Sequence, residues 1–92
     1  MKVVWTNTAK NQLRTIFNFY KEKSVQGANT IKNEILNTTK KIHFADQYQK
    51  DEIEPEYRRI IVRDYKILYL AIDEVIYIAK IFSTKRNSVR QL

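Results

Sequence analysis

Residues 57–82 read YRRIIVRDYKILYLAIDEVIYIAKIF, and this stretch decides the fold class. Ile, Val, Tyr and Leu dominate it, which is typical of β-strands. Asp64 and the pair Asp73-Glu74 interrupt the apolar run, so the pattern predicts three strands, over residues 57–63, 65–72 and 75–82. Because connections this short cannot carry the chain across a sheet, we expect consecutive strands to form antiparallel hairpins.

The preceding part of the chain follows a helical pattern. Apolar residues recur every three or four positions from Ala9 to Tyr20, which predicts an amphipathic helix over residues 7–23. One of the three polar residues at positions 6–8 is expected to cap it. A second helix begins at Ser24, and its apolar stripe runs on to Ala45, so the sole histidine, His43, is expected within this helix.

Two shorter stretches complete the order of elements. Val3-Val4-Trp5 is a short β-prone run, and residues 46–56 form a polar, acidic connector in which Pro55 stops any helix. The whole chain therefore predicts one α+β domain over residues 1–92, in the order β-α-α-β-β-β. We expect the helical hairpin to pack on one face of a twisted, mainly antiparallel sheet, leaving the other face partly open.

Composition narrows the class of protein. The chain has 92 residues, a formal net charge of +7 and no Cys, which excludes disulfides and thiolate metal sites. Residues 57–92 carry eight Lys/Arg against three Asp/Glu, so we expect an anionic partner. The alternative is that this positive charge only keeps the protein soluble. With no signal-peptide pattern and no apolar run of roughly 20 residues, we expect a cytoplasmic protein without a membrane span. We expect no metal or small-molecule cofactor.

Four short patterns follow one another along nearly the whole chain. They are Trp5-Thr6 followed by Ala9, Leu13 and Ile16; Tyr57-Arg58-Arg59-Ile60; Tyr65-Lys66-Ile67-Leu68-Tyr69; and Ile81-Phe82-Ser83-Thr84-Lys85-Arg86-Asn87. In this order and spacing they resemble the RelE/ParE superfamily, the toxins of bacterial type II toxin–antitoxin (plasmid-stabilisation-like) modules. The resemblance implies a cognate antitoxin and one of two targets. RelE-like members cleave mRNA on the ribosome, whereas ParE-like members poison DNA gyrase.

The RelE-like alternative needs cations around a scissile phosphate, and the resemblance assigns candidates for them. Lys66 and Arg86 match basic positions of that group, and Arg58 or its neighbour Arg59 lies on a strand that carries further basic residues there. Alternation along the strands allows Lys66 and Lys80 to share the open face of the sheet. As ordinary solvated sheet residues they would show the same pattern.

The acid–base side of such an enzyme is where the match fails. Ribosome-dependent members commonly end with a Tyr or His after the last arginine, and residues 87–92 contain neither. Losing one such group costs about 10²–10⁴ in rate. The other titratable residues are better explained by structural roles. His43 is expected to be an ordinary residue of the second helix, and Glu52 and Glu54 are expected to be solvated residues of the connector. Four tyrosines on the predicted strands are expected to pack in the sheet: Tyr57, Tyr65, Tyr69 and Tyr77.

The sequence therefore favours a ParE-like toxin, neutralised by an antitoxin and inhibiting gyrase by protein contact. A RelE-like ribosome-dependent endoribonuclease is the alternative. A small basic nucleic-acid-binding domain is the third, although the chain has no RNP-like aromatic–glycine motif. We expect an antitoxin segment with apolar and acidic residues to bind exposed Leu68, Leu70 or Ile78, or the helical hairpin.

Overall fold

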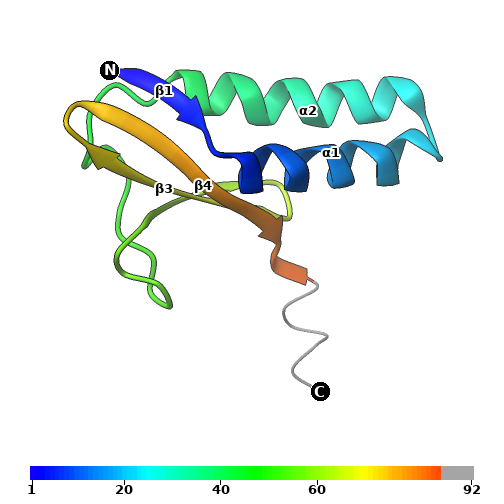
Figure 1. Cartoon of the computed structure of the whole chain (residues 1–92). Helices are drawn as coiled ribbons and strands as arrows, with labels where there is room; N and C mark the ends of the chain where they lie inside the picture. Colours follow the sequence, from blue (N-terminus) through cyan, green and yellow to red (C-terminus); the bar gives the residue numbers. More distant parts are fainter. Residues whose placement is uncertain (86–92) are drawn as a thin grey trace.

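The computed structural model describes residues 1–85 of the chain, which form two helices and a four-stranded sheet. The helices lie above the sheet in Figure 1. The elements are β1 (Lys2–Trp5), α1 (Asn7–Lys21), α2 (Val25–Lys40), β2 (Arg58–Val62), β3 (Tyr65–Ile72) and β4 (Val75–Ser83). The predicted β-α-α-β-β-β order and α+β class are confirmed. No helix among the described residues is long and apolar enough to cross a membrane.

Side-chain caps define where both helices begin. The Thr6 hydroxyl accepts the Ala9 N–H at 3.2 Å, and the Ser24 hydroxyl accepts the Gly27 N–H at 3.0 Å. Each cap satisfies an N–H group that the first helical turn leaves without a partner. Thr6 also donates to the Ile78 carbonyl at 2.9 Å, which fixes the start of α1 against β4.

The second helix is shorter than predicted. It ends at Lys40, where the chain tightens: the N–H of Ile42 donates to the Thr39 carbonyl three residues earlier. The expected helical position of His43 was therefore wrong. Ile42 is nonetheless fully buried, because it reaches the core from this turn. The apolar pattern thus predicted burial correctly and the helix end incorrectly.

The sheet has the strand order β1-β4-β3-β2. The β2–β3 and β3–β4 hairpins are antiparallel, as predicted, whereas β1 lies parallel to β4 with Lys2 opposite Val75. Asp73 and Glu74 both have positive φ in the tight turn between β3 and β4, which gives that hairpin the backbone of a type I′ turn. The register of this hairpin shifts after Leu68, which is opposite Lys80, while Tyr69 is opposite Ile78.

The core lies between the helices and the sheet. It consists of apolar side chains from α1, α2 and the facing side of the strands: Ala9, Leu13, Ile31, Ile35, Ile42, Ile60, Val62, Tyr65, Ile67, Tyr69, Ile76, Ile78 and Ile81. Leu68 is also fully buried, but it lies outside this cluster. Alternation places it on the opposite face of the sheet, so another part of the chain must cover it there.

Candidate functional site

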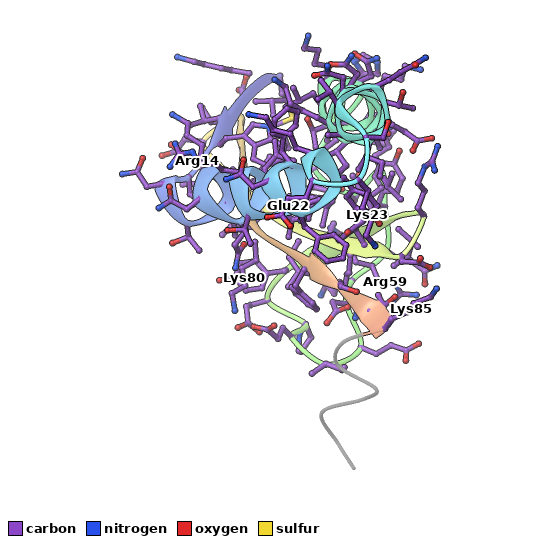
Figure 2. All side chains as sticks on the ribbon, turned by 90° about the vertical axis from the view of Figure 1, so that its right-hand side faces the viewer. Arg14, Glu22, Lys23, Arg59, Lys80 and Lys85 are labelled. Atoms are coloured by element: carbon purple, nitrogen blue, oxygen red, sulfur yellow. The ribbon has the colours of Figure 1, made fainter. Side chains whose placement is uncertain are left out.

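The face of the sheet that points away from the helices carries basic residues from three strands. Strand register places Arg59 and Lys80 on either side of Leu68. It also places Lys66 opposite Phe82. Directly opposed side chains in antiparallel strands share a face, and the register shift between Leu68 and Tyr69 brings Lys80 onto the same face as Lys66. Figure 2 shows Lys80 and Arg59 on the side of the sheet away from α1.

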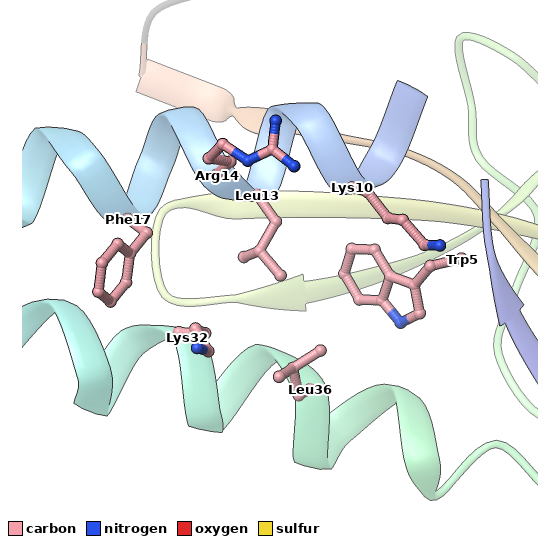
Figure 3. A pocket seen from close by; sticks show the side chains of 7 residues that line it. All are labelled: Trp5, Lys10, Leu13, Arg14, Phe17, Lys32 and Leu36. Atoms are coloured by element: carbon pink, nitrogen blue, oxygen red, sulfur yellow. The ribbon is translucent and has the colours of Figure 1, made fainter. Parts of the chain in front are cut away.

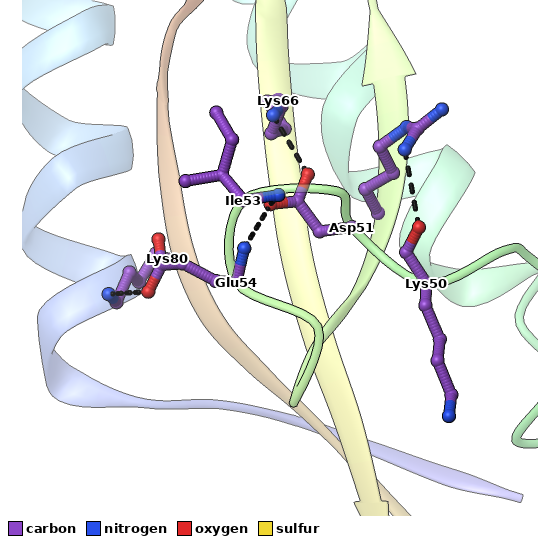
Figure 4. Close-up of polar contacts among 7 residues, drawn as sticks. Lys50, Asp51, Ile53, Glu54, Lys66 and Lys80 are labelled. Carbon is purple, nitrogen blue, oxygen red and sulfur yellow. Dashed lines mark hydrogen bonds and ion pairs between the residues drawn. The ribbon is translucent and has the colours of Figure 1, made fainter.

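The connector between α2 and β2 folds under this face and brings a carboxylate to each lysine (Figure 4). Lys66 Nζ lies 2.8 Å from Asp51 Oδ1, and Lys80 Nζ lies 2.8 Å from Glu54 Oε1. Lys80 also lies 5.4 Å above the ring of Tyr57 at the end of the connector. The face that was expected to be partly open is therefore covered by the acidic connector of the chain itself.

Asp51 makes the more enclosed of the two ion pairs, with 2% of its side chain exposed against 15% for Lys66. Its second oxygen, Oδ2, accepts the backbone N–H groups of Ile53 at 3.1 Å and Glu54 at 2.8 Å. Burial by itself raises the pKa of Asp51, but the hydrogen bonds from Lys66 and these two N–H groups outweigh it, so the pKa lies below its ordinary value.

The pair between Lys80 and Glu54 is more open to solvent, with side-chain exposures of 37% and 30%. The hydrogen bond to Glu54 raises the pKa of Lys80, although partial burial acts in the opposite direction. An ion pair this exposed contributes only about 0–1 kcal/mol to the stability of the fold. Asp51 is therefore the main polar anchor of the connector.

The connector also changes which apolar residues are exposed. Leu68 and Ile78 were expected as exposed contacts for an antitoxin, and this was wrong, because both are fully buried. Leu68 lies under the connector, and Ile78 faces the helices as part of the core. Leu70 is half-buried.

The remaining candidate cations do not gather around Lys66. Arg58 is opposite Tyr69 and so shares the helix-facing side of the sheet, where its Nη1 donates to the Tyr48 carbonyl at 2.8 Å. Arg59 is on the same face as Lys66, but its Nη1 donates to the Lys50 carbonyl at 3.2 Å. Arg86 lies outside the described residues.

Other residues considered as an acid or base are either exposed or bonded to the backbone. His43 is exposed between the end of α2 and the connector, where its backbone N–H donates to the Gln47 side chain. Tyr69 is buried and its hydroxyl donates to the Ala45 carbonyl, and burial raises its pKa. Glu52 is exposed. Among the described residues, no three His, Asp or Glu side chains form a group that could hold a metal ion.

The charges separate by layer in a way that the sequence analysis missed. Residues 1–45, which include both helices, carry eight Lys/Arg and two Asp/Glu, whereas residues 46–92 carry nine and eight. The net charge is thus +6 on the first half and +1 on the second. Most of the net positive charge therefore lies on the part of the chain that contains both helices. Counting the charges of residues 1–45 as well as those of residues 57–92 would have found this.

Comparisons with known proteins agree with this architecture. A family model described as the ParE toxin of the type II toxin–antitoxin system, parDE, matches residues 3–88. A solved structure titled "Chromosomal ParDE TA system from P. aeruginosa" contains a chain with 17% identity and a TM-score of 0.78, over 90% of this chain and 95% of that one. No curated protein matches. Because the family model spans nearly the whole chain, the protein belongs to the ParE toxin family of type II toxin–antitoxin systems.

Proposed function

We propose that this ParE-like toxin inhibits DNA gyrase by protein contact in the cytoplasm and is neutralised by a cognate antitoxin. We base this choice of mechanism on the face of the sheet away from the helices, where carboxylates of the connector neutralise the lysines. Lys66, one of the candidates that the RelE-like alternative assigns to phosphate, lies 2.8 Å from Asp51 of the connector, and Lys80 beside it lies 2.8 Å from Glu54. A phosphate at Lys66 would have to displace Asp51.

The energetics of that displacement argue against phosphate binding at this face. Separating a buried pair leaves one charge without a partner and costs about 3–5 kcal/mol. An approaching phosphate would also meet the negative charge of Glu54. Action by surface contact requires neither a free cation cluster nor an acid–base pair, so the ParE-like mechanism is the better supported one.

The experiment that tests this function measures both targets in parallel. Purified protein is added to DNA gyrase in an ATP-dependent supercoiling assay, with topoisomerase I relaxation as the specificity control. In cells, induction is followed by 5′-end mapping of mRNA. We expect lost supercoiling, DNA damage and unchanged transcripts. Growth arrest with normal gyrase activity would contradict the proposal.

The RelE-like alternative makes a separable prediction. Codon-phased mRNA cuts that disappear in Arg86→Ala or Lys66→Ala would establish it, and those two residues with Arg58 would then be its phosphate-binding candidates. Neutralisation is tested by co-expressing a short acidic protein encoded next to the toxin gene. We expect growth to recover and the two chains to co-purify.

A further inference from the structure

A pocket of about 670 Å³ lies between α1 and the end of β4. Strand β1 pairs with β4 from Val75 to Ile78, and beyond that point α1 lies beside β4. The side chains that line the pocket include Gln12, Phe19, Tyr20, Tyr65, Phe82 and Lys85. The volume of the pocket falls within the range of about 300–1,000 Å³ that is typical of small-molecule sites.

Aromatic rings from α1, β3 and β4 make up much of the pocket wall. Tyr65 is buried, while Tyr20 and Phe82 are half-buried. Phe19 is 55% exposed and packs edge-on against Tyr20, with ring centroids 5.2 Å apart. The hydroxyls of Tyr20 and Tyr65 lie 3.3 Å from each other, so these rings adjoin. A flat ligand can therefore stack on aromatic surface that is open to solvent.

Two hydrogen-bond donors of α1 are held at this pocket. Gln12 Oε1 accepts the Ile81 N–H at 2.8 Å, which fixes the side-chain amide, and Gln12 Nε2 donates to no described group. The Tyr20 hydroxyl accepts a hydrogen bond from the Tyr65 hydroxyl, and its own proton has no acceptor among residues 1–85. Ring nitrogens and carbonyl oxygens along the edge of a nucleobase are suitable acceptors for such donors.

Two lysines place positive charge near the mouth of the pocket. Lys85 pairs with Asp64 at 3.3 Å, but both side chains are more than half exposed, so this ion pair is weak. Lys23 Nζ lies 4.6 Å from the centre of the Phe19 ring and forms no ion pair with any described carboxylate. Figure 2 shows Lys23 near the end of α1 and Lys85 after β4, on the same side of the molecule.

We propose that this pocket binds one nucleotide unit, with its base stacked on Phe19 and Tyr20. The edge of the base would accept hydrogen bonds from Gln12 and Tyr20, and the attached phosphate would lie near Lys23 and Lys85. A free nucleotide and a single strand of nucleic acid both present this base and phosphate. The site is additional to the proposed gyrase contact and does not depend on it.

The mixture of rings and donors favours a nucleotide over an apolar anchor residue of a protein. Such an anchor would cover the rings but leave the Gln12 amide and the Tyr20 hydroxyl without acceptors. The groove between the two helices has a different character, because Leu13 separates Phe17 from Trp5 there (Figure 3). An aliphatic floor of that kind offers no continuous stacking surface for a base.

The probe is 2-aminopurine, a fluorescent adenine analogue whose emission falls when it stacks on another ring. Three forms are titrated with the protein: the riboside, the riboside 5′-monophosphate, and a short single-stranded oligothymidine that carries one 2-aminopurine. We expect saturable quenching with the monophosphate or the oligonucleotide, and weaker binding as salt is added. The riboside lacks the phosphate and should bind about fivefold more weakly.

A matched pair of ring substitutions tests the stacking surface. Phe19→Leu removes a ring that is 55% exposed at the pocket, and Phe44→Leu removes one that is 54% exposed elsewhere. Both variants keep an apolar side chain at the surface, and circular dichroism verifies that both are folded. We expect Phe19→Leu to bind about tenfold more weakly and Phe44→Leu less than twofold more weakly.

A matched pair of double variants separates local from overall charge. Lys23→Gln/Lys85→Gln removes the two charges near the pocket. Lys21→Gln/Lys40→Gln removes two from the last turns of α1 and α2, at exposed residues that form no described ion pair. We expect the first variant to bind about fivefold more weakly and the second less than twofold more weakly.

Four results would overturn the nucleotide proposal. These are unchanged emission with all three probes, equal binding of the riboside and its monophosphate, equal weakening in the two ring variants, or equal weakening in the two lysine variants. Binding of the monophosphate would support a free nucleotide as ligand, and binding of the oligonucleotide alone would support a single strand. The supercoiling assay is independent, so nucleotide binding without gyrase inhibition would reject the proposed function and keep this site.

Discussion

Replacing Asp51 tests whether the connector is held by one buried carboxylate. Asp51→Ala removes the 2.8 Å pair with Lys66 and two hydrogen bonds from backbone N–H groups, at a side chain that is 2% exposed. Leaving a largely buried partner without its counter-charge costs about 3–5 kcal/mol. That is a large share of the roughly 5–15 kcal/mol that stabilises a small domain. We therefore expect Asp51→Ala to lower the free energy of unfolding by about 3–4 kcal/mol.

Urea unfolding, followed by Trp5 fluorescence and far-UV circular dichroism, measures this loss. Glu52→Ala is the matched control, because Glu52 lies next to Asp51 in the chain but is exposed, and its change should stay within about 0.5 kcal/mol. Adding Lys66→Met to Asp51→Ala should restore part of the stability, since Lys66 is then no longer a buried charge without a partner. A loss below about 1 kcal/mol in Asp51→Ala, or no recovery in the double variant, would refute the reasoning.

The pH dependence follows from the lowered pKa of Asp51. A carboxyl group whose pKa is depressed by folding contributes stability above its unfolded value of 3.8 and loses it as the pH falls through the folded pKa. The stability difference between the native chain and Asp51→Asn should therefore be constant from pH 5 to 7 and shrink below about pH 4. A difference that stays constant down to pH 2.5 would contradict this assignment.

Two further substitutions test other parts of the fold. Tyr69→Phe leaves the Ala45 carbonyl and the Tyr48 N–H without their shared hydroxyl, so we expect the free energy of unfolding in urea to fall by about 1–2 kcal/mol. Tyr77→Phe is the control, because the Tyr77 hydroxyl has no described hydrogen bond, and this variant should keep nearly the same stability. Equal losses in the two variants would contradict the role of the Tyr69 hydroxyl. Glu74 has a positive φ of 66° in the β3–β4 turn, which glycine adopts without strain. Glu74→Gly should therefore raise the melting temperature and increase the free energy of unfolding by about 1 kcal/mol. A destabilised variant would show that this turn is not strained.

Local patterns in the sequence predicted most of the secondary structure. The strand bounds at 65–72 were predicted as the structure has them, because a β-prone apolar run and the acidic residues that end it, Asp64 and Asp73-Glu74, lie within a few positions of one another. The start of α1 was predicted with its cap among the three polar residues 6–8, and the structure shows that the cap is Thr6. The end of α2 was missed, since the buried Ile42 fits a helical stripe equally well from a turn.

The sequence by itself determined the α+β class and the two antiparallel hairpins, whereas the shared face of Lys66 and Lys80 depends on a register shift that only the structure shows. Only the tertiary structure decided that β1 pairs parallel with β4, and that Asp51 and Glu54 neutralise those lysines. The physical reason is that secondary structure follows from side chains a few residues apart. Charge pairing and burial instead depend on where a distant segment returns, and Asp51 meets Lys66 only because the connector folds under the sheet.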